Sequence, residues 1–166
     1  MGFDPAYLSH LPILSAAVSI TQGPVLELGA GLGSTLLLHG LCGASKRKLV
    51  TLESDKEWLG KFLNFGRSWH EFRFVEDFLD IPEYKKEWGL VFIDHGIALQ
   101  RGISLKKLEN SSVIVCHDTC HFFLYEYEPT LSNNFRSHWD YQIMGPRTTV
   151  VSNIFNVAKK FAEFGL

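Results

Sequence analysis

The chain of 166 residues lacks the features that mark several classes of protein. Its three cysteines are an odd number without the spacing of a disulfide framework, which favours a reducing compartment. The first residues carry Asp4 and no basic region, so they do not predict a signal peptide, and no run of 18 apolar residues predicts a membrane span. We therefore expect a cytoplasmic protein with no membrane partner.

A strong excess of one charge is also missing. The 16 Lys and Arg side chains against 18 Asp and Glu side chains give a net charge of −2. The one cluster of basic residues, at 46–48, is short, so the chain offers no basic stripe for nucleic acid and we expect no nucleic-acid partner. With 46% hydrophobic residues and no internal repeat, residues 1–166 suit a single α/β domain.

The most informative segment is residues 25–35, VLELGAGLGST. It predicts a buried strand, a tight glycine loop and the start of a helix, whose free N–H groups favour a polar or anionic ligand. The glycines of the loop let another molecule approach the backbone closely. A dinucleotide fingerprint, G-x-G-x-x-G, would need its third glycine at Ser34, so the spacing argues against that class of cofactor.

The sequence predicts strands at 25–28, 48–52, 72–75, 89–93 and 112–116, and polar side chains follow the last four of them. These side chains are Glu53, Asp77, the pair Asp94 and His95, and the pair His117 and Asp118. Alternating strands and helices predict a mostly parallel sheet, in which ligands bind at the carboxyl ends of the strands. Two further strands are expected at 141–144 and 148–152, and an N-terminal helix at 4–20, interrupted by Pro12.

The loop motif, Glu-x-Gly-x-Gly-x-Gly from residue 27 to residue 33, resembles the first motif of the class I S-adenosylmethionine (SAM)-dependent methyltransferases. That resemblance implies a Rossmann-like, doubly wound, mostly parallel sheet with one antiparallel strand near the edge and helices on both faces. It also implies SAM as cofactor, with Glu53 accepting bonds from the ribose hydroxyls and Asp77 contacting the adenine amino group. The loop residues expected to hold the rest of the cofactor are Glu27, Gly29, Gly31, Gly33 and Ser34.

Two further segments, LVFIDH at 90–95 and VCHDT at 115–119, resemble motifs of the catechol-type, metal-dependent O-methyltransferases. That narrower resemblance implies Asp94 and Asp118 as ligands of a Mg²⁺-like ion and His95 as a neighbour of the adenine. Thr119 stands where the family has an asparagine ligand, so it is the third candidate ligand. The compact segment 116–121 also contains Cys and His, but six consecutive residues do not easily close a zinc tetrahedron.

The catechol-type family also has a basic lysine, which would fall on Ile97 here. His117, His95 or His121 could replace it, because histidine titrates near neutral pH, and His117 is our candidate base. The aromatic stretch 121–127 is expected either to line an acceptor pocket or to pack on the sheet edge. Arg101 is expected on a solvated face rather than at an acceptor carboxylate.

These patterns together predict a SAM-dependent methyltransferase that transfers a methyl group to an oxygen of a small-molecule acceptor. Asp94, His117 and Asp118 are the candidate catalytic residues, with Mg²⁺ as a second candidate cofactor. Two alternatives stay open, namely an NAD(P)-dependent oxidoreductase of Rossmann type and a non-catalytic SAM-binding or interaction domain. Because the chain is short, a homodimer could complete the acceptor pocket.

Overall fold

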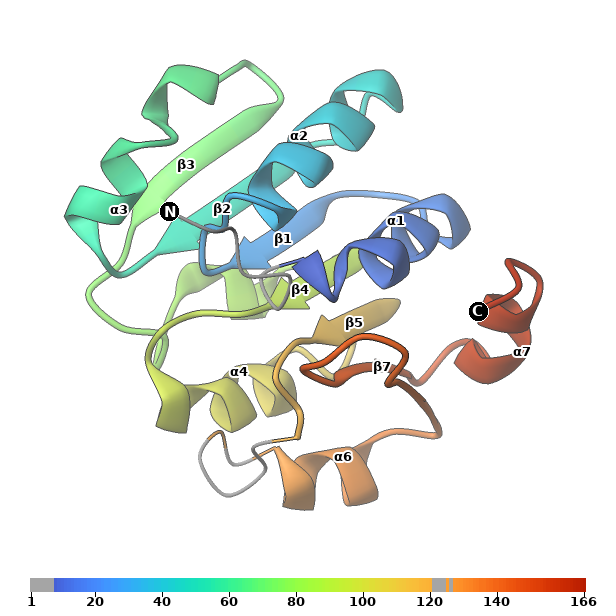
Figure 1. The fold of residues 1–166 in the computed structure, drawn as a ribbon. Helices are drawn as coiled ribbons and strands as arrows, with labels where there is room; N and C mark the ends of the chain where they lie inside the picture. The colour runs from blue at the N-terminus through green and yellow to red at the C-terminus, as the bar shows by residue number, and fades with distance from the viewer. Residues whose placement is uncertain (1–7, 121–124, 126) are drawn as a thin grey trace.

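The computed structural model describes residues 8–120, 125 and 127–166, and it places a seven-stranded sheet at the centre of the molecule (Figure 1). The strand order is β3-β2-β1-β4-β5-β7-β6. Strands β1 to β5 are parallel to one another, whereas β7 runs antiparallel to both β5 and β6. The strands are β1 (Val25–Leu28), β2 (Leu49–Glu53), β3 (His70–Phe74), β4 (Leu90–Ile93), β5 (Val113–Cys116), β6 (Ser137–Tyr141) and β7 (Thr148–Ser152). The predicted fold class is confirmed.

Helices cover both faces of the sheet, because alternate residues of its buried strands face opposite sides. One core lies under α1 (Leu11–Ile20), α2 (Ser34–Ala44) and α7 (Val157–Ala162). The other lies on the side of α4 (Arg101–Lys107) and α6 (Glu128–Asn134). The shorter elements are α3 (Lys56–Gly60) and the 3₁₀ helices η2 (Leu63–Phe65), η3 (Pro82–Lys85) and η4 (Ala98–Gln100).

Two elements have other bounds than the sequence predicts, namely the helix expected at 4–20 and the strand expected at 141–144. Helix α1 begins at Leu11, because Pro12 occupies its first turn, where proline needs no hydrogen-bond donor, instead of interrupting it. Strand β6 ends at Tyr141 and does not span 141–144; Ile143 is 77% exposed in the loop that follows. In β6, Trp139 packs on Phe161 of α7, with 5.2 Å between ring centroids. Contact with a helix, which the local pattern does not reveal, determines where this strand lies.

Gly29 fixes how closely the end of β1 approaches the end of β4. Its φ is +97°, and a Cβ atom at this position would lie 2.5 Å from the carbonyl oxygen of Asp94. Only glycine fits both the left-handed backbone and this contact. The first glycine of the loop therefore brings the ends of two central strands together at the edge where the polar residues gather.

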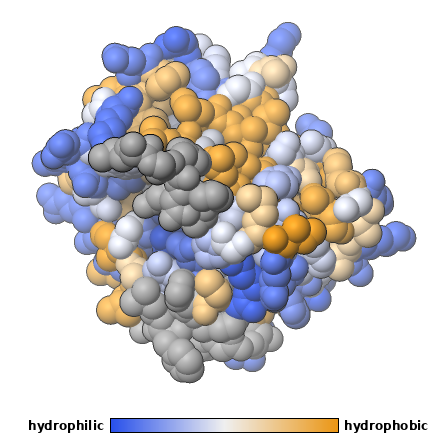
Figure 2. Space-filling model, viewed as in Figure 1, coloured by the Kyte–Doolittle hydropathy of each residue, from blue (hydrophilic) through white to orange (hydrophobic). Residues whose placement is uncertain are grey.

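The surface on the side shown in Figure 2 carries an apolar area over α2. Exposed apolar side chains of the glycine loop and this helix are Leu32 and Leu36. Within the part of the chain that the structure describes, no helix is both long enough and apolar enough to cross a membrane.

Candidate cofactor and acceptor site

Glu53, the last residue of β2, lies against the glycine loop. Its Oε2 accepts a hydrogen bond from the backbone N–H of Ala30 at 2.8 Å, and its Oε1 accepts from the N–H groups of Ser54 and Asp55 at 2.7 and 2.9 Å. The residue is only 6% exposed. Each carboxylate oxygen can accept about two bonds, so Oε2 keeps room for one ligand hydroxyl. The carboxylate is thus held rigidly where a ribose is expected.

Glu27 lies beneath the loop rather than on its surface. It is fully buried, and its carboxylate accepts hydrogen bonds from the hydroxyl of Thr51 at 2.7 Å and from that of Thr35 at 3.0 and 3.1 Å. Burial raises its pKa to about 7, although the hydroxyl bonds act in the opposite direction. Thr35 also accepts from the N–H of Gly31 at 2.9 Å. The geometry supports a role for Glu27 in holding the loop, and its contact with a cofactor stays a prediction.

The rest of the loop leads directly into α2. Gly33 is the N-cap of this helix, without a capping side chain, and Ser34 is its first residue, with only 1% of its surface exposed. The indole N–H of Trp58 donates to the carbonyl of Ala30 at 2.7 Å and so ties α3 to the loop. Nothing in the local sequence distinguishes Trp58 from a packing residue, so this contact could not be predicted.

The two residues expected near an adenine lie in different environments. Asp77 is exposed after β3, and its Oδ1 accepts from the N–H of Leu79 at 2.8 Å. His95 is fully buried and stacks on Phe78 with 3.9 Å between centroids, while its Nε2 lies 3.2 Å from the hydroxyl of Ser104. Burial lowers the pKa of His95 to about 3, so it is neutral at physiological pH. Asp77 is open to a ligand, whereas His95 faces the core.

Arg101 bridges the two candidate catalytic carboxylates. Its Nη2 lies 3.1 Å from Asp94 Oδ1 and its Nη1 lies 3.4 Å from Asp118 Oδ2. The side chain stacks on the ring of Tyr125, and its Nε donates to the carbonyl of His95 at 2.7 Å. Arg101 is only 5% exposed, so the expectation of a solvated face was wrong. The sequence concealed this because the contacts come from two different strand ends and from a distant tyrosine.

Asp94 also contacts His117, which in turn contacts Ser9 and His10 before helix α1. Nδ1 of His117 lies 3.2 Å from Asp94 Oδ1, and Nε2 lies 2.9 Å from the hydroxyl of Ser9. The ring of His10 meets that of His117 in a T-shaped contact, with 4.5 Å between centroids. Burial favours the protonated form of Asp94, but the bond and charge of His117 and the charge of Arg101 hold its pKa below the ordinary value. Asp94 is therefore ionised at neutral pH.

Ser9 and His10 are the site residues that sequence reasoning missed. They lie more than 100 residues before His117, and the pattern of the first 20 residues indicated only an amphipathic helix. Both are buried, and burial with the neighbouring His117 lowers the pKa of His10 to about 4. A polar pair directly before an apolar helix was the only local signal.

The structure does not bring all three expected Mg²⁺ ligands together, because Thr119 turns away from Asp94 and Asp118. The hydroxyl of Thr119 lies 2.7 Å from that of Thr149 on β7 and 3.1 Å from Nε of Arg147, and the residue is fully buried. Between Asp94 and Asp118 stands the guanidinium of Arg101, which already supplies a positive charge there. This arrangement gives no support to a magnesium site built from these three residues.

Asp118 has a left-handed backbone, with φ of +58°, which is uncommon outside glycine but tolerated by aspartate. Such backbone outliers cluster at functional sites. His121, the third candidate base, and the neighbouring residues 122–124 and 126 lie outside the described residues. Of the remaining aromatic stretch, Tyr127 is fully buried, which favours packing over an exposed pocket wall at that position.

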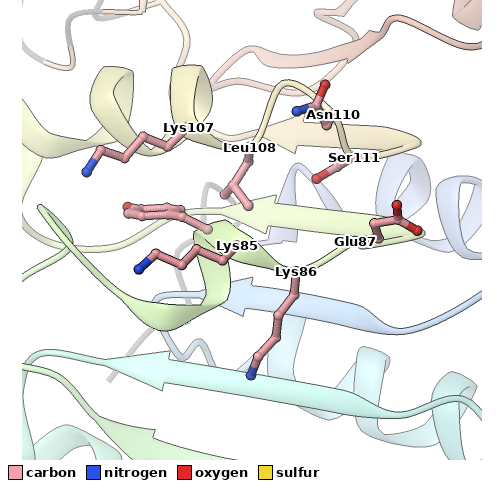
Figure 3. Close-up of a pocket in the computed structure, with 8 residues that line it drawn as sticks. Lys85, Lys86, Glu87, Lys107, Leu108, Asn110 and Ser111 are labelled. Carbon is pink, nitrogen blue, oxygen red and sulfur yellow. The ribbon is translucent and has the colours of Figure 1, made fainter.

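A separate cavity of about 510 Å³ lies between η3 and α4 (Figure 3). Its lining includes Lys85, Lys86 and Lys107, but Lys86 pairs with Glu83 at 3.0 Å and Lys107 donates to a backbone carbonyl. At one end it reaches Ser111, which leads into the start of β5. That edge is opposite to the carboxyl ends of the parallel strands, where ligands bind in such sheets.

Comparison with known proteins supports the fold and leaves the acceptor open. No family model matches the chain, and no curated protein matches it. Solved structures that match include the SAH-bound methyltransferase PaMTH1 of Podospora anserina (SAH, S-adenosylhomocysteine), with a TM-score of 0.63 and 15% identity over 87% of this chain and 76% of that chain.

Two other matches are also methyltransferases. The precorrin-6y C5,15-methyltransferase of Geobacter metallireducens gives a TM-score of 0.60 and 15% identity, with 87% of each chain covered. Human methyltransferase-like protein 13, solved with SAH, gives 0.58 and 16%, covering 95% of this chain and 85% of that chain. At these identities the likeness shows the fold alone: this chain has the Rossmann-like fold of SAM-dependent methyltransferases.

Proposed function

We propose that the protein is a SAM-dependent methyltransferase that methylates an oxygen of a small-molecule acceptor. The observation that carries the proposal is the position of Glu53, a buried carboxylate fixed against the glycine loop at the end of β2. An ionised carboxylate accepts bonds from ribose hydroxyls well. The fold likeness to methyltransferases solved with SAH supports the same cofactor here.

In this proposal the glycine loop holds the methionine part of SAM through Gly29, Gly31 and Gly33, and Asp77 contacts the adenine. Methyl transfer is an in-line displacement at the sulfonium methyl group, so the protein acts mainly by positioning the two reactants. Orientation of this kind contributes about 7–11 kcal/mol to lowering a barrier. A rigid loop over the buried, hydrogen-bonded Glu27 suits that task.

The acceptor would bind beside Asp94, His117 and Asp118. His117 is the candidate base: with its Nδ1–H donated to Asp94 at 3.2 Å, its Nε2 can accept a proton from a hydroxyl. The hydroxyl of Ser9, 2.9 Å from Nε2, shows that this nitrogen has a hydroxyl within hydrogen-bond distance. Arg101 would keep Asp94 ionised and stay paired with Asp118 while the acceptor is bound.

Thermal unfolding with added cofactors tests the proposal. SAH at 100 times its dissociation constant should stabilise the protein by about 2.7 kcal/mol, whereas NAD(P) should not. Glu53→Gln should remove most of the SAH shift, and Glu57→Gln, which alters an exposed glutamate on the neighbouring α3, should leave it unchanged. A shift with NAD(P) alone would overturn the proposal in favour of an oxidoreductase.

A non-catalytic SAM-binding domain is the second candidate, since the lysine expected of the catechol-type enzymes is Ile97 here. Turnover of radiolabelled SAM with a panel of phenols and alcohols separates the two, because a binding domain would show the SAH shift without methyl transfer. We further propose a cytoplasmic location and a small-molecule rather than a nucleic-acid acceptor, in line with the net charge of −2. A homodimer that completes the acceptor pocket would appear in light scattering as twice the 18.8 kDa chain mass.

A further inference from the structure

The proposed methyl transfer uses Asp94 and His117 but gives no role to His10, which forms a cluster with them. Each offers one ligand atom, and these three atoms lie within 4.8 Å of one another. The two histidines are buried, at 3% and 4% exposed, and Asp94 is partly buried. We propose that this cluster binds a divalent transition-metal ion through two imidazoles and one carboxylate.

The state of His10 is the first reason. Its ring is almost completely buried against Phe92 and His117, yet neither of its nitrogens has a hydrogen-bond partner among the described residues. Buried polar side chains are nearly always satisfied, and an exception calls for an explanation such as an ion. A metal bound to one nitrogen of His10 would supply the missing partner.

The hydrogen bonds of His117 are the second reason. The hydroxyl of Ser9 lies 2.9 Å from Nε2 of His117 and 3.3 Å from the carbonyl of Pro146. With a metal bound, Nε2 would carry the ring proton and donate it to Ser9, and the lone pair of Nδ1 would face the metal beside Asp94 Oδ1, 3.2 Å away. Without the metal, the other tautomer donates its Nδ1–H to Asp94, as in the proposed function.

The same arrangement matches how metal-binding histidines are held in proteins. A ligating histidine usually donates its other ring N–H to an oxygen acceptor, which fixes the tautomer and the orientation of the ring. The hydroxyl of Ser9 would be that oxygen acceptor for Nε2 of His117. Three protein ligands leave a fourth position open, as in catalytic zinc sites rather than structural ones.

The ligand set also indicates which metals would bind. Imidazole suits zinc, iron, copper and nickel, whereas magnesium takes oxygen ligands in octahedral geometry. Ligand atoms around a tetrahedral zinc ion lie about 3.3 Å apart, given bonds of about 2.0 Å. The pair formed by His117 and Asp94 already has this spacing, at 3.2 Å. His10, in the turn that precedes α1, would move toward them by about 1.5 Å, given bonds of that length.

This site would lie where the acceptor is expected to bind, so its role in turnover rests on the proposed function. An acceptor hydroxyl in the open position would have its pKa lowered by the metal, which would relieve His117 of the task of a base. Metal binding itself does not depend on that role and can be measured without any acceptor.

The experiment uses the whole chain, stripped with a chelator and titrated with Zn²⁺ and Co²⁺. We expect one Zn²⁺ per chain and visible Co²⁺ absorption bands of the intensity typical of four or five ligands. His10→Gln should weaken Zn²⁺ binding by more than the roughly 10- to 100-fold that loss of an outer-shell partner costs. His138→Gln, which alters an exposed histidine on β6, should leave the affinity unchanged.

Three results would overturn the inference: no stoichiometric Zn²⁺ in the wild-type chain, Co²⁺ bands typical of six oxygen ligands, or equal Zn²⁺ affinity in the folded His10→Gln variant. The wild-type Co²⁺ spectrum needs no variant and therefore serves even if His10→Gln does not fold. The SAH thermal shift is measured in parallel. If that shift persists without metal binding, only the metal site falls, whereas metal binding without any SAH shift would remove the methyltransferase proposal instead.

Discussion

The substitution Glu27→Gln should remove a pH-dependent loss of stability that is built into the glycine loop. Glu27 is fully buried, and burial raises its pKa from 4.5 to about 7 in the folded protein. In the unfolded chain the same carboxyl titrates near its ordinary value. Below pH 4.5 it is protonated in both states, so it contributes no difference there.

Between pH 4.5 and pH 7 the unfolded chain loses this proton while the folded protein keeps it, so the free energy of unfolding falls as pH rises. A pKa difference of this size corresponds to about 3 kcal/mol at pH 8, after which no further loss occurs. Glutamine cannot ionise, and its carbonyl can still accept the hydroxyl bonds of Thr35 and Thr51. The variant should therefore gain stability relative to the wild type as pH rises.

Urea unfolding followed by tryptophan fluorescence, repeated from pH 4.5 to pH 8, measures this difference. Taking wild type minus variant removes the contributions of all other titrating groups. Glu87→Gln, at an exposed glutamate, is the matched control and should give a difference that does not vary with pH. A difference for Glu27→Gln that stayed constant over the whole range would refute the raised pKa of Glu27.

Three further predictions concern the loop, the ion pairs and the buried histidines. Gly29→Ala should destabilise the protein by about 2 kcal/mol or more, since φ is +97° and the new Cβ would meet the carbonyl of Asp94. At Gly40 within α2 the new Cβ would meet nothing, so Gly40→Ala should stabilise the protein by about 0.5–1 kcal/mol. Thermal unfolding compares the two variants. Arg101→Met should cost about 3 kcal/mol by leaving Asp94 without its buried cation, and an unchanged urea midpoint would contradict this. Burial lowers the pKa of His70 to about 3, so only the unfolded chain gains a proton at this residue as pH falls from 6.5 to 4. This lowers the free energy of unfolding of the wild type by about 3 kcal/mol over that range. His70→Gln should abolish this loss, which is measured by urea unfolding at both pH values.

The sequence predicted best what a local pattern determines. Strands β1 and β7 lie at the predicted residues, because buried central strands read as short apolar runs bounded by turn residues. The same logic placed Glu53, Asp94 and His117 at one edge of the sheet, since the carboxyl ends of parallel strands meet there. Each of these residues lies at the carboxyl end of its strand or directly after it.

The parts that escaped prediction depend on contacts between distant segments. Arg101 looked like a surface residue because its partners come from β4, β5 and a tyrosine beyond them. His10 reaches the site only because α1 packs across the sheet beside β4 and β5, and no local pattern reports that packing. Thr119 stands where the catechol-type family has a metal ligand, yet its bond to Thr149 turns it toward β7. Side-chain direction at a strand end is set by the neighbouring strand.

Asp94 joins the glycine loop to the proposed acceptor site, formed by Asp94, His117 and Asp118, within one residue. Its carbonyl lies against Gly29, where a Cβ would come within 2.5 Å, and its carboxylate holds both His117 and Arg101. A displacement of the loop therefore has to move the peptide of Asp94, and with it the orientation of the imidazole. Loss of the carboxylate at Glu53 leaves that peptide in place, because Glu53 contacts the other side of the loop, at Ala30. Changes at Gly29 should thus impair cofactor binding and the proposed acceptor site together, whereas changes at Glu53 should impair cofactor binding alone.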